Sequence, residues 1–220
     1  YLAWVETLKQ KFHNTLFETC SSGGMRMDYR TLSNFTIVST SDQINYTKYP
    51  YIVGNVLTAV LPEQAAVWSY PVDKDVKEVT KEQVVMNMIN SFLGRMHLAS
   101  DISLLDEQKK ELVNEGVEYY KKLAKIKKNL YPYNPKDFTE FFDDNVVAGL
   151  IDKKHNKLYL AVWNLKDKGE FKVELLKEIK TVEIAYPKKE LINFSFDKNV
   201  LCIDFTENVQ ARFFEIDFSN

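Results

Sequence analysis

The chain has 220 residues, of which 45% are hydrophobic and 27% are charged, and its formal net charge at pH 7 is −2. This composition supports a packed core, excludes an intrinsically disordered chain and leaves room for one large or two modest domains. The near-neutral charge gives no reason to expect binding to nucleic acid, and no apolar run approaches the ~18 residues that cross a membrane.

The first predicted element is a helix over residues 1–12. Its apolar residues recur three or four positions apart, which is the spacing of one helix face. These residues are Leu2, Val5, Leu8 and Phe12. We expect this face to pack inward and the helix to end at His13.

Two short apolar segments, 15–19 and 35–40, follow and predict buried strands because they are rich in β-forming residues. Small polar residues come directly after each one, as at the ends of strands that line a site. After the first strand, Gly23 and Gly24 allow a tight turn and a close approach by a ligand. After the second stands Asp42, a common position for a catalytic carboxylate in a β/α barrel.

The middle of the chain predicts helices and a further strand. An apolar run over residues 56–61 stops at Pro62, and Thr80 with Gln83 forms a capping box that opens a helix. Residues 92–98 are predicted to form the next strand. Trp68 and Tyr70 suit either a platform for a sugar ring or core packing.

A long helix is predicted from Ser103 to about Leu130, with acidic residues early and basic residues late, as the helix dipole favours. Its inner face is expected to hold Val113, Val117, Tyr120 and Ala124. Its basic end is interpreted as a solvated surface rather than a nucleic-acid contact. The lysines of this end are Lys121, Lys122, Lys125, Lys127 and Lys128.

Two prolines near residue 135 end the helical region. Beyond them, short apolar or alternating runs recur about every ten residues, which is typical of an antiparallel β-sandwich. The predicted strands are 146–151, 157–163, 171–176, 181–186, 191–196, 200–205 and 211–218. We therefore expect one domain over residues 1–135 and a second over residues 136–220.

The two cysteines, Cys20 and Cys202, lie far apart in sequence and in different predicted domains. This favours free thiols in a reducing compartment and hence a cytoplasmic protein. The three histidines lack ligand spacing, and no CxxC or HExxH motif occurs, so we expect no metal and no cofactor.

The string Cys-Ser-Ser-Gly-Gly-Met-Arg-Met-Asp over residues 20–28, with Ser-Asp at 41–42, resembles glycoside hydrolase family 36. Members of that family are retaining α-galactosidases and their relatives. Residues 61–71 also resemble that family, with the sequence Leu-Pro-Glu-Gln-Ala-Ala-Val-Trp-Ser-Tyr-Pro. The resemblance covers the whole chain but only the C-terminal part of such an enzyme. It implies that residues 1–135 form the last half of a (β/α)8 TIM barrel, about four β/α units, and that residues 136–220 form the C-terminal β-sandwich.

The resemblance also implies roles for individual residues. A retaining glycosidase uses two carboxyl groups about 5–5.5 Å apart. Asp42 matches the acid/base of the family, and Cys20 and Gly23 match positions that line its sugar pocket. The family's nucleophile is the aspartate of a Lys-x-Asp motif, which this chain lacks. We therefore expect the nucleophile upstream of Tyr1 and no activity from these 220 residues alone.

Each of these roles has a plainer alternative. From spacing alone, Asp42 is a helix cap or an exposed loop residue, Cys20 a small core residue and Gly23 part of an ordinary turn. Arg26 and Asp28 are expected to form an ion pair that holds the loop.

Two positions depart from the family pattern. Many members have tryptophan where this chain has Ser39, and a second aspartate where it has Asn45. We interpret these differences as those of a subgroup rather than as lost activity.

The implied activity is hydrolysis of terminal α-galactosyl groups from oligosaccharides such as raffinose and melibiose. Some members of the family are instead α-galactosyl transferases, and others act on N-acetylgalactosamine; the sequence leaves both alternatives open. A hypothesis from another class is a non-catalytic carbohydrate-binding or oligomerisation module carried by the β-sandwich. Homo-oligomers are common in the family, so we expect one here.

Overall fold

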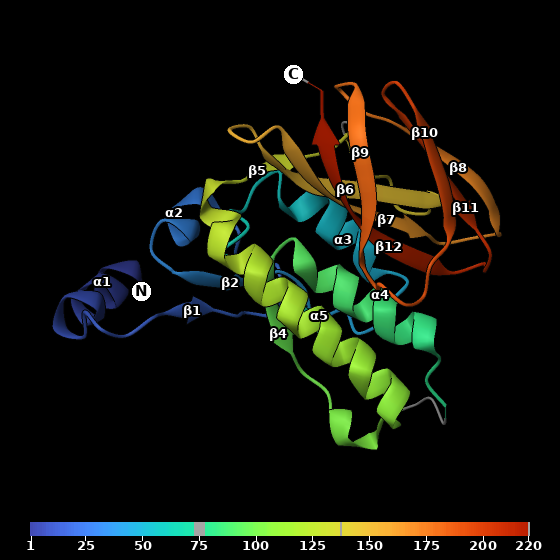
Figure 1. The fold of residues 1–220 in the computed structure, drawn as a ribbon. Helices are drawn as coiled ribbons and strands as arrows, with labels where there is room; N and C mark the ends of the chain where they lie inside the picture. Colours follow the sequence, from blue (N-terminus) through green and yellow to red (C-terminus); the bar gives the residue numbers. More distant parts are fainter. Residues whose placement is uncertain (73–77, 137, 220) are drawn as a thin grey trace.

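The computed structural model describes residues 1–72, 78–136 and 138–219. A parallel sheet, a layer of helices and two antiparallel sheets follow one another across the molecule (Figure 1). The helices are α1 (Leu2–Lys11), α2 (Tyr29–Leu32), α3 (Tyr49–Val56), α4 (Lys81–Phe92) and α5 (Glu107–Ile126), with 3-10 turns at Ile102–Leu104 and Lys127–Asn129. Among the residues described, no helix combines the length and the apolar character needed to cross a membrane.

The parallel sheet has the strand order β1-β2-β3-β4. Its strands are β1 (Glu18–Thr19), β2 (Ile37–Ser39), β3 (Ala65–Ser69) and β4 (Arg95–Leu98). Each strand runs parallel to the next, with Val38 opposite Ala65 and Trp68 opposite His97. The segments that follow the four strands therefore meet at one edge of the sheet, as the sequence predicts.

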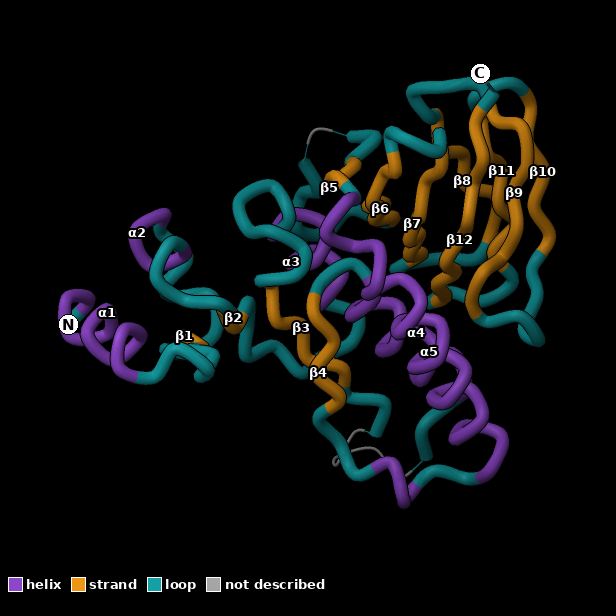
Figure 2. Tube along the Cα trace, turned by 60° about the vertical axis from the view of Figure 1, so that its left-hand side comes forward, coloured by secondary structure: helices purple, strands orange, loops and turns teal. Residues whose placement is uncertain are grey.

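The N-terminal elements are shorter and more exposed than predicted. The strand expected over residues 15–19 is reduced to β1, and Leu16 is 62% exposed. In α1 only Val5 is buried, and Phe12 lies on the surface. The reason is visible in Figure 2, where α1 and α2 lie away from the main helices and sheets, so most of the apolar face of α1 has no layer to pack against.

The third apolar run also folds differently. Residues 56–61 complete α3 and the turns after it, and the strand comes later, at β3. Val56 and Val60 are buried in the same core as β3. A short apolar run is compatible with a buried strand or a buried helix end, and here the Pro62 turn separates the two.

The two antiparallel sheets contain all seven strands predicted beyond residue 135, and one more. One sheet has the order β5-β6-β7-β12-β9 and the other the order β10-β11-β8. The additional strand, β5, pairs with β6 across residues 131–133, just before the expected domain boundary. The strands are β5 (Tyr131–Tyr133), β6 (Asn145–Asp152), β7 (Lys157–Asn164), β8 (Gly169–Glu174), β9 (Ile179–Tyr186), β10 (Asn193–Asp197), β11 (Val200–Phe205) and β12 (Gln210–Phe218).

The inner strands of the five-stranded sheet, β6, β7 and β12, are buried on both faces. In β7, Tyr159, Ala161 and Trp163 join the core shared with the helices. The alternate residues, such as Leu160 and Val162, join the core shared with the three-stranded sheet. Burial on both sides explains why β6 and β7 are continuous apolar runs rather than alternating ones.

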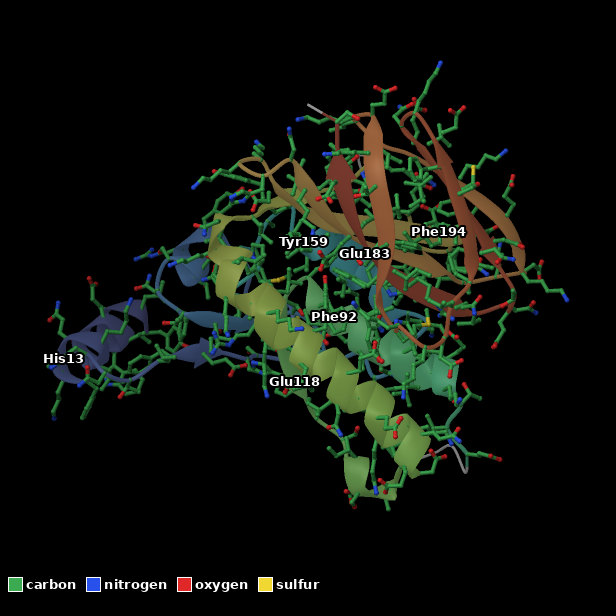
Figure 3. The ribbon with its side chains drawn as sticks, viewed as in Figure 1. His13, Phe92, Glu118, Tyr159, Glu183 and Phe194 are labelled. Atoms are coloured by element: carbon green, nitrogen blue, oxygen red, sulfur yellow. The ribbon has the colours of Figure 1, made fainter. Side chains whose placement is uncertain are left out.

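Phe92, at the end of α4, is the centre of an aromatic cluster beneath α5 (Figure 3). Its ring centroid lies 5.5 Å from that of Tyr119, 5.1 Å from that of Tyr186 and 5.2 Å from that of Phe213. Tilted and edge-to-face contacts of this kind add to the stabilisation from apolar burial. One cluster thus joins α4, α5 and the five-stranded sheet.

The capping box at Thr80 and Gln83 is confirmed, with both reciprocal hydrogen bonds present at the start of α4. The long helix α5 begins later than predicted, because the Asp106 carboxylate accepts a hydrogen bond from Lys109 N and caps it. On its inner face Val113 is buried as expected. Ala124, however, is exposed, and Leu123 is buried in its place.

Lys127 corrects the expectation of a fully solvated basic helix end. Its side chain is buried, and its Nζ donates to the carbonyl oxygens of Phe92, at 2.8 Å, and Gly94. The same ammonium lies 4.5 Å from the centroid of the Tyr120 ring. The C-terminal carbonyl groups of α4 attract a cation, which sequence spacing within α5 does not reveal.

A pH titration tests the burial of Lys127, because burial lowers its pKa from 10.5 to about 7. The unfolded chain then binds more protons between these two values, so stability should rise with pH by up to about 1.4 kcal/mol per unit. We expect this rise in urea unfolding of the wild type and its loss in Lys127→Met. Lys128→Met, at an exposed neighbour, should keep the wild-type slope, and equal slopes in all three proteins would contradict the assignment.

An ion pair between Glu82 and Arg212 joins the start of α4 to β12. The guanidinium is bidentate, with N–O distances of 2.8 and 2.7 Å to the two carboxylate oxygens. Arg212 Nε also donates to Glu190 O at 2.9 Å. The side chains are 2% and 11% exposed for Arg212 and Glu82, so water screens the pair little.

Removing the guanidinium should leave the Glu82 carboxylate without its cation in a mostly buried place. We expect Arg212→Met to lower the free energy of unfolding by about 3–5 kcal/mol, measured in urea. As a matched control, Lys189→Met removes the exposed pair with Glu111 and should change the midpoint little. If the two substitutions lowered the free energy of unfolding equally, the buried pair would contribute no more to stability than the exposed pair.

Candidate functional site

The site predicted around Asp42 lies at the carboxyl edge of the parallel sheet. Asp42 is exposed and follows β2, while Gly23 belongs to the turn after β1. Gly23 has φ +21°, and a methyl group added to it would stand 2.4 Å from Asp42 N and 2.6 Å from Asp42 Oδ1. The structure therefore brings Gly23 and Asp42 into direct contact, and no larger residue fits at Gly23 without displacing the aspartate.

A second glycine fixes the same turn to β2. Gly24 has φ +81°, and its N–H donates to Ser39 O at 2.8 Å. A methyl group added at Gly24 would lie 2.6 Å from Thr40 O. The two glycines thus allow the chain leaving β1 to lie against the end of β2, next to Asp42.

Cys20 is exposed and directly follows β1 at the carboxyl edge of the parallel sheet. It lines an open hollow of about 440 Å³ together with Glu18, Arg26 and Tyr1. Asp42 and Gly23 do not belong to the lining of this hollow. Two of the three predicted site residues are therefore in contact, and the third lines a separate hollow beside them.

Arg26 and Asp28 do not form the predicted ion pair within the part of the chain that the structure describes. Asp28 instead caps α2, where its carboxylate accepts from Thr31 N at 3.0 Å and Thr31 Oγ1 at 2.7 Å. These hydrogen bonds lower the pKa of Asp28. The cap explains the aspartate without any catalytic role.

The two departures from the family pattern have structural partners. The indole Nε1 of Trp68 donates to Ser39 Oγ at 3.1 Å across β2 and β3. Asn45 Oδ1 accepts from Thr47 N at 2.9 Å and organises the turn before α3. Ser39 and Trp68 thus form one unit at the sheet edge, which the sequence does not reveal because they are 29 positions apart.

His97 is a residue that sequence reasoning passed over. It lies opposite Trp68 in β4, with ring centroids 4.8 Å apart in an edge-to-face contact. Burial lowers the pKa of His97, and the nearby charge of Glu18 partly opposes this. The imidazole is therefore neutral near pH 7 and extends the aromatic surface of Trp68.

The negative charge of Asp42 acts on two tyrosines, Tyr49 and Tyr70. Burial raises the pKa of Tyr70, and the negative charge of Asp42 raises it further. Tyr49 is fully buried beneath the edge, and its hydroxyl accepts from Trp68 N at 3.2 Å. Both phenols stay protonated at neutral pH, so Asp42 lies near hydroxyl groups rather than near competing anions.

No group of three or more His, Cys, Asp or Glu side chains within residues 1–72, 78–136 and 138–219 could hold a metal ion. The side chains described at this edge include the carboxylate of Asp42, the hydroxyl of Ser39, the phenols of Tyr49 and Tyr70, and the rings of Trp68 and His97.

The fold of this chain, a parallel sheet packed through helices on two antiparallel sheets, matches part of the structures of solved α-galactosidases. The chain belongs to the melibiase family, whose model matches residues 2–129. This membership gives the chain a glycoside hydrolase origin.

The structural comparisons agree with this fold. The galactosidase domain of the α-galactosidase-sucrose kinase AgaSK has a TM-score of 0.78 at 16% identity, and covers 99% of this chain and 31% of its own. The α-galactosidase AgaA of Geobacillus stearothermophilus, in complex with raffinose, has a TM-score of 0.78 at 15% identity, with 98% and 30% covered. The α-galactosidase of Lactobacillus brevis has a TM-score of 0.72 at 16% identity, with 99% and 31% covered.

The chain therefore spans about 31% of the length of the AgaSK galactosidase domain chain. No curated protein matches its sequence. The fold comparison and the family match thus give the α-galactosidase relationship, and the functions of individual residues depend on the geometry above.

Replacing Gly23 tests the contact with Asp42. Gly23→Ala should destabilise the chain and shift the amide resonances of residues 41–45, because the new methyl group collides with Asp42. Gly169→Ala is the matched control, since Gly169 also has positive φ but has no atom within 4 Å of an added methyl group. The control should show only the conformational cost of about 1–3 kcal/mol.

A stability loss for Gly23→Ala no larger than that of the control, with residues 41–45 unshifted in the spectrum, would show that the turn does not position Asp42.

Proposed function

We propose that this chain supplies the acid/base carboxylate of a retaining α-galactosidase, and that this residue is Asp42. The observation that carries the proposal is the contact between the Gly23 turn and Asp42 at the carboxyl edge of a parallel sheet. The turn fixes the carboxylate where a substrate can reach it. The match to the melibiase family supports the reaction class.

In this reaction Asp42 protonates the glycosidic oxygen as the bond to the sugar breaks, and it then takes a proton from the water that completes hydrolysis. Tyr70 stays protonated because burial and the Asp42 charge raise its pKa, so it adds no second negative charge near the carboxylate. The nucleophilic carboxylate would come from outside these 220 residues, since the chain lacks a Lys-x-Asp motif.

The proposed substrates are oligosaccharides with terminal α-galactosyl groups, such as raffinose and melibiose. Support comes from the family match and from two structural relatives in complex with raffinose and with stachyose. Cys20 and Gly23 would line the galactose pocket. Both follow β1 at the same edge as Asp42, which supports this placement.

The proposed architecture is the C-terminal half of a (β/α)8 barrel over residues 1–135 and a C-terminal β-sandwich over residues 136–220. The four parallel strands and the two antiparallel sheets support this division. The cytoplasmic location and a homo-oligomeric state stay predictions, as does the preference for hydrolysis over galactosyl transfer.

Asp42→Asn in an N-terminally extended protein tests the proposal. The substitution removes the proton donor and keeps the shape, so hydrolysis of raffinose should fall by about 10²–10⁴-fold while raffinose binding persists. Asp167→Asn, at another exposed aspartate, should retain the unmodified rate. Full raffinose hydrolysis by Asp42→Asn would exclude the acid/base role.

The 220-residue chain alone should not hydrolyse the substrate. Turnover by the short chain would mean that its own residues include the nucleophile. Sugar binding by residues 136–220 that is independent of Asp42 would favour the alternative of a carbohydrate-binding module.

A further inference from the structure

The strand β10 (Asn193–Asp197) is an edge strand of the three-stranded sheet, whose order is β10-β11-β8. Figure 2 shows it at the margin of the molecule. Four of its five residues are exposed, and Phe194 is partly buried. One side of β10 is therefore open to pairing with another strand.

The backbone of β10 has free hydrogen-bonding groups on this open side. Asp197 and Val200 enclose the two-residue turn 198–199 and so form a hydrogen-bonded pair. Such pairs alternate along an antiparallel ladder, so the N–H and C=O groups of Phe194 and Phe196 point away from β11. Within the part of the chain that the structure describes, no other backbone group bonds to them. These groups are therefore available to a further strand.

The other edge strands of the two antiparallel sheets carry residues that hinder pairing between chains. β5 contains Pro132, which has no N–H to donate, and β8 contains Lys172. β9 contains Lys180 and pairs irregularly with β12. Lysine, proline and bulges are the usual means by which proteins prevent edge-to-edge association. β10 has neither lysine nor proline, and its register with β11 is regular throughout.

The sequence of β10 is complementary to itself. A two-fold axis through Ser195 would place Phe194 of one copy opposite Phe196 of the other, and each such pair would exchange two backbone hydrogen bonds. The same register would place Asn193 opposite Asp197, so that an amide meets each carboxylate and the two carboxylates stay apart. No like charges of β10 would then face each other.

The phenylalanine side chains also fit this pairing. The Phe194 ring lies 5.7 Å from that of Phe214, on the face of β10 toward the five-stranded sheet. Phe196 shares that face, because alternate residues of a strand point the same way. Phe196 is nonetheless 41% exposed. A second copy would cover it with Phe194, and aromatic pairs directly opposite each other stabilise antiparallel strands.

We propose that β10 is a dimerisation edge, through which two copies of this chain form one continuous sheet with β10 antiparallel to itself. The partner is a second copy because hydrogen bonds, charge and aromatic packing all match in this single register. Five residues from each copy are fewer than the roughly 20–30 per side of a standard interface, so the dimer is weak and forms at raised concentration. The proposal uses the β-sandwich alone and does not depend on the proposed role of Asp42.

The symmetry can be tested at Ser195, which would face its own copy on the axis. Ser195→Lys and Ser195→Asp each place like charges opposite one another, which disfavours pairing. Each variant alone should associate at least tenfold more weakly than the wild type in sedimentation equilibrium. An equimolar mixture of the two should recover the association, and ~1 M salt should reduce this recovery.

Ser103→Lys is the matched control, at an exposed serine outside β10, and it should associate like the wild type. Ser195 is exposed, so its variants should keep the dispersed amide spectrum of the folded chain. If either variant loses that spectrum, Phe196→Thr replaces it. This substitution keeps a strand-forming residue, removes the aromatic pair and should weaken association at least tenfold.

Amide hydrogen exchange locates the contact. At raised concentration the amides of Phe194 and Phe196 should exchange more slowly, because they become paired. The amide of Ser195, which already faces β11, is the internal reference and should change less.

A wild-type chain that stays monomeric up to about 1 mM, where even weak contacts are populated, would overturn the dimerisation edge. So would a mixture of the two Ser195 variants that associates no better than either alone, or a dimer in which the Phe194 and Phe196 amides stay unprotected. Loss of the acid/base role in the Asp42→Asn experiment would leave this dimer unaffected, so the two proposals fail separately.

Discussion

The bidentate ion pair between Glu82 and Arg212 holds the two kinds of layer in this molecule together. It joins the first turn of α4 to the second-last strand of the five-stranded sheet, in surroundings that exclude most water. A buried pair is stabilising only when its remaining hydrogen-bond donors are satisfied. Arg212 meets this requirement, since its Nε also donates to Glu190 O. The pair thereby holds the first turn of α4 against β12.

The position of α4 matters to the rest of the structure because α4 has neighbours on both sides. Phe92 at its end packs on Tyr186 and Phe213 of the five-stranded sheet, and the carbonyl of Phe92 binds the buried Lys127 ammonium after α5. At its other end, Gln83 and Asn87 line a cavity at the carboxyl ends of β3 and β4. The five-stranded sheet therefore supports the parallel sheet through α4, which shares one core with both.

At that edge, close packing of backbone positions the chemistry. The two glycines after β1 fit against Ser39, Thr40 and Asp42, and the Trp68 indole holds the Ser39 hydroxyl from the neighbouring strand. Asp42 stays exposed to solvent. A carboxylate that is held by backbone contacts and open to solvent is what the proposed acid/base role requires.

The sequence by itself determined the features that depend on neighbouring residues. The capping box at Thr80, the seven strands after residue 135 and the glycine turn before Asp42 all follow from local propensity and spacing. Only the tertiary structure decided which apolar segments pack against a neighbouring layer. For this reason Leu16 is exposed, whereas Leu123 is buried. It also decided the pairing of Glu82 with Arg212, 130 positions apart, and the burial of Lys127 in an otherwise solvated basic run. Contacts across such separations depend on how whole layers pack. The pattern of residues within one helix or strand therefore does not identify the distant residue that it contacts.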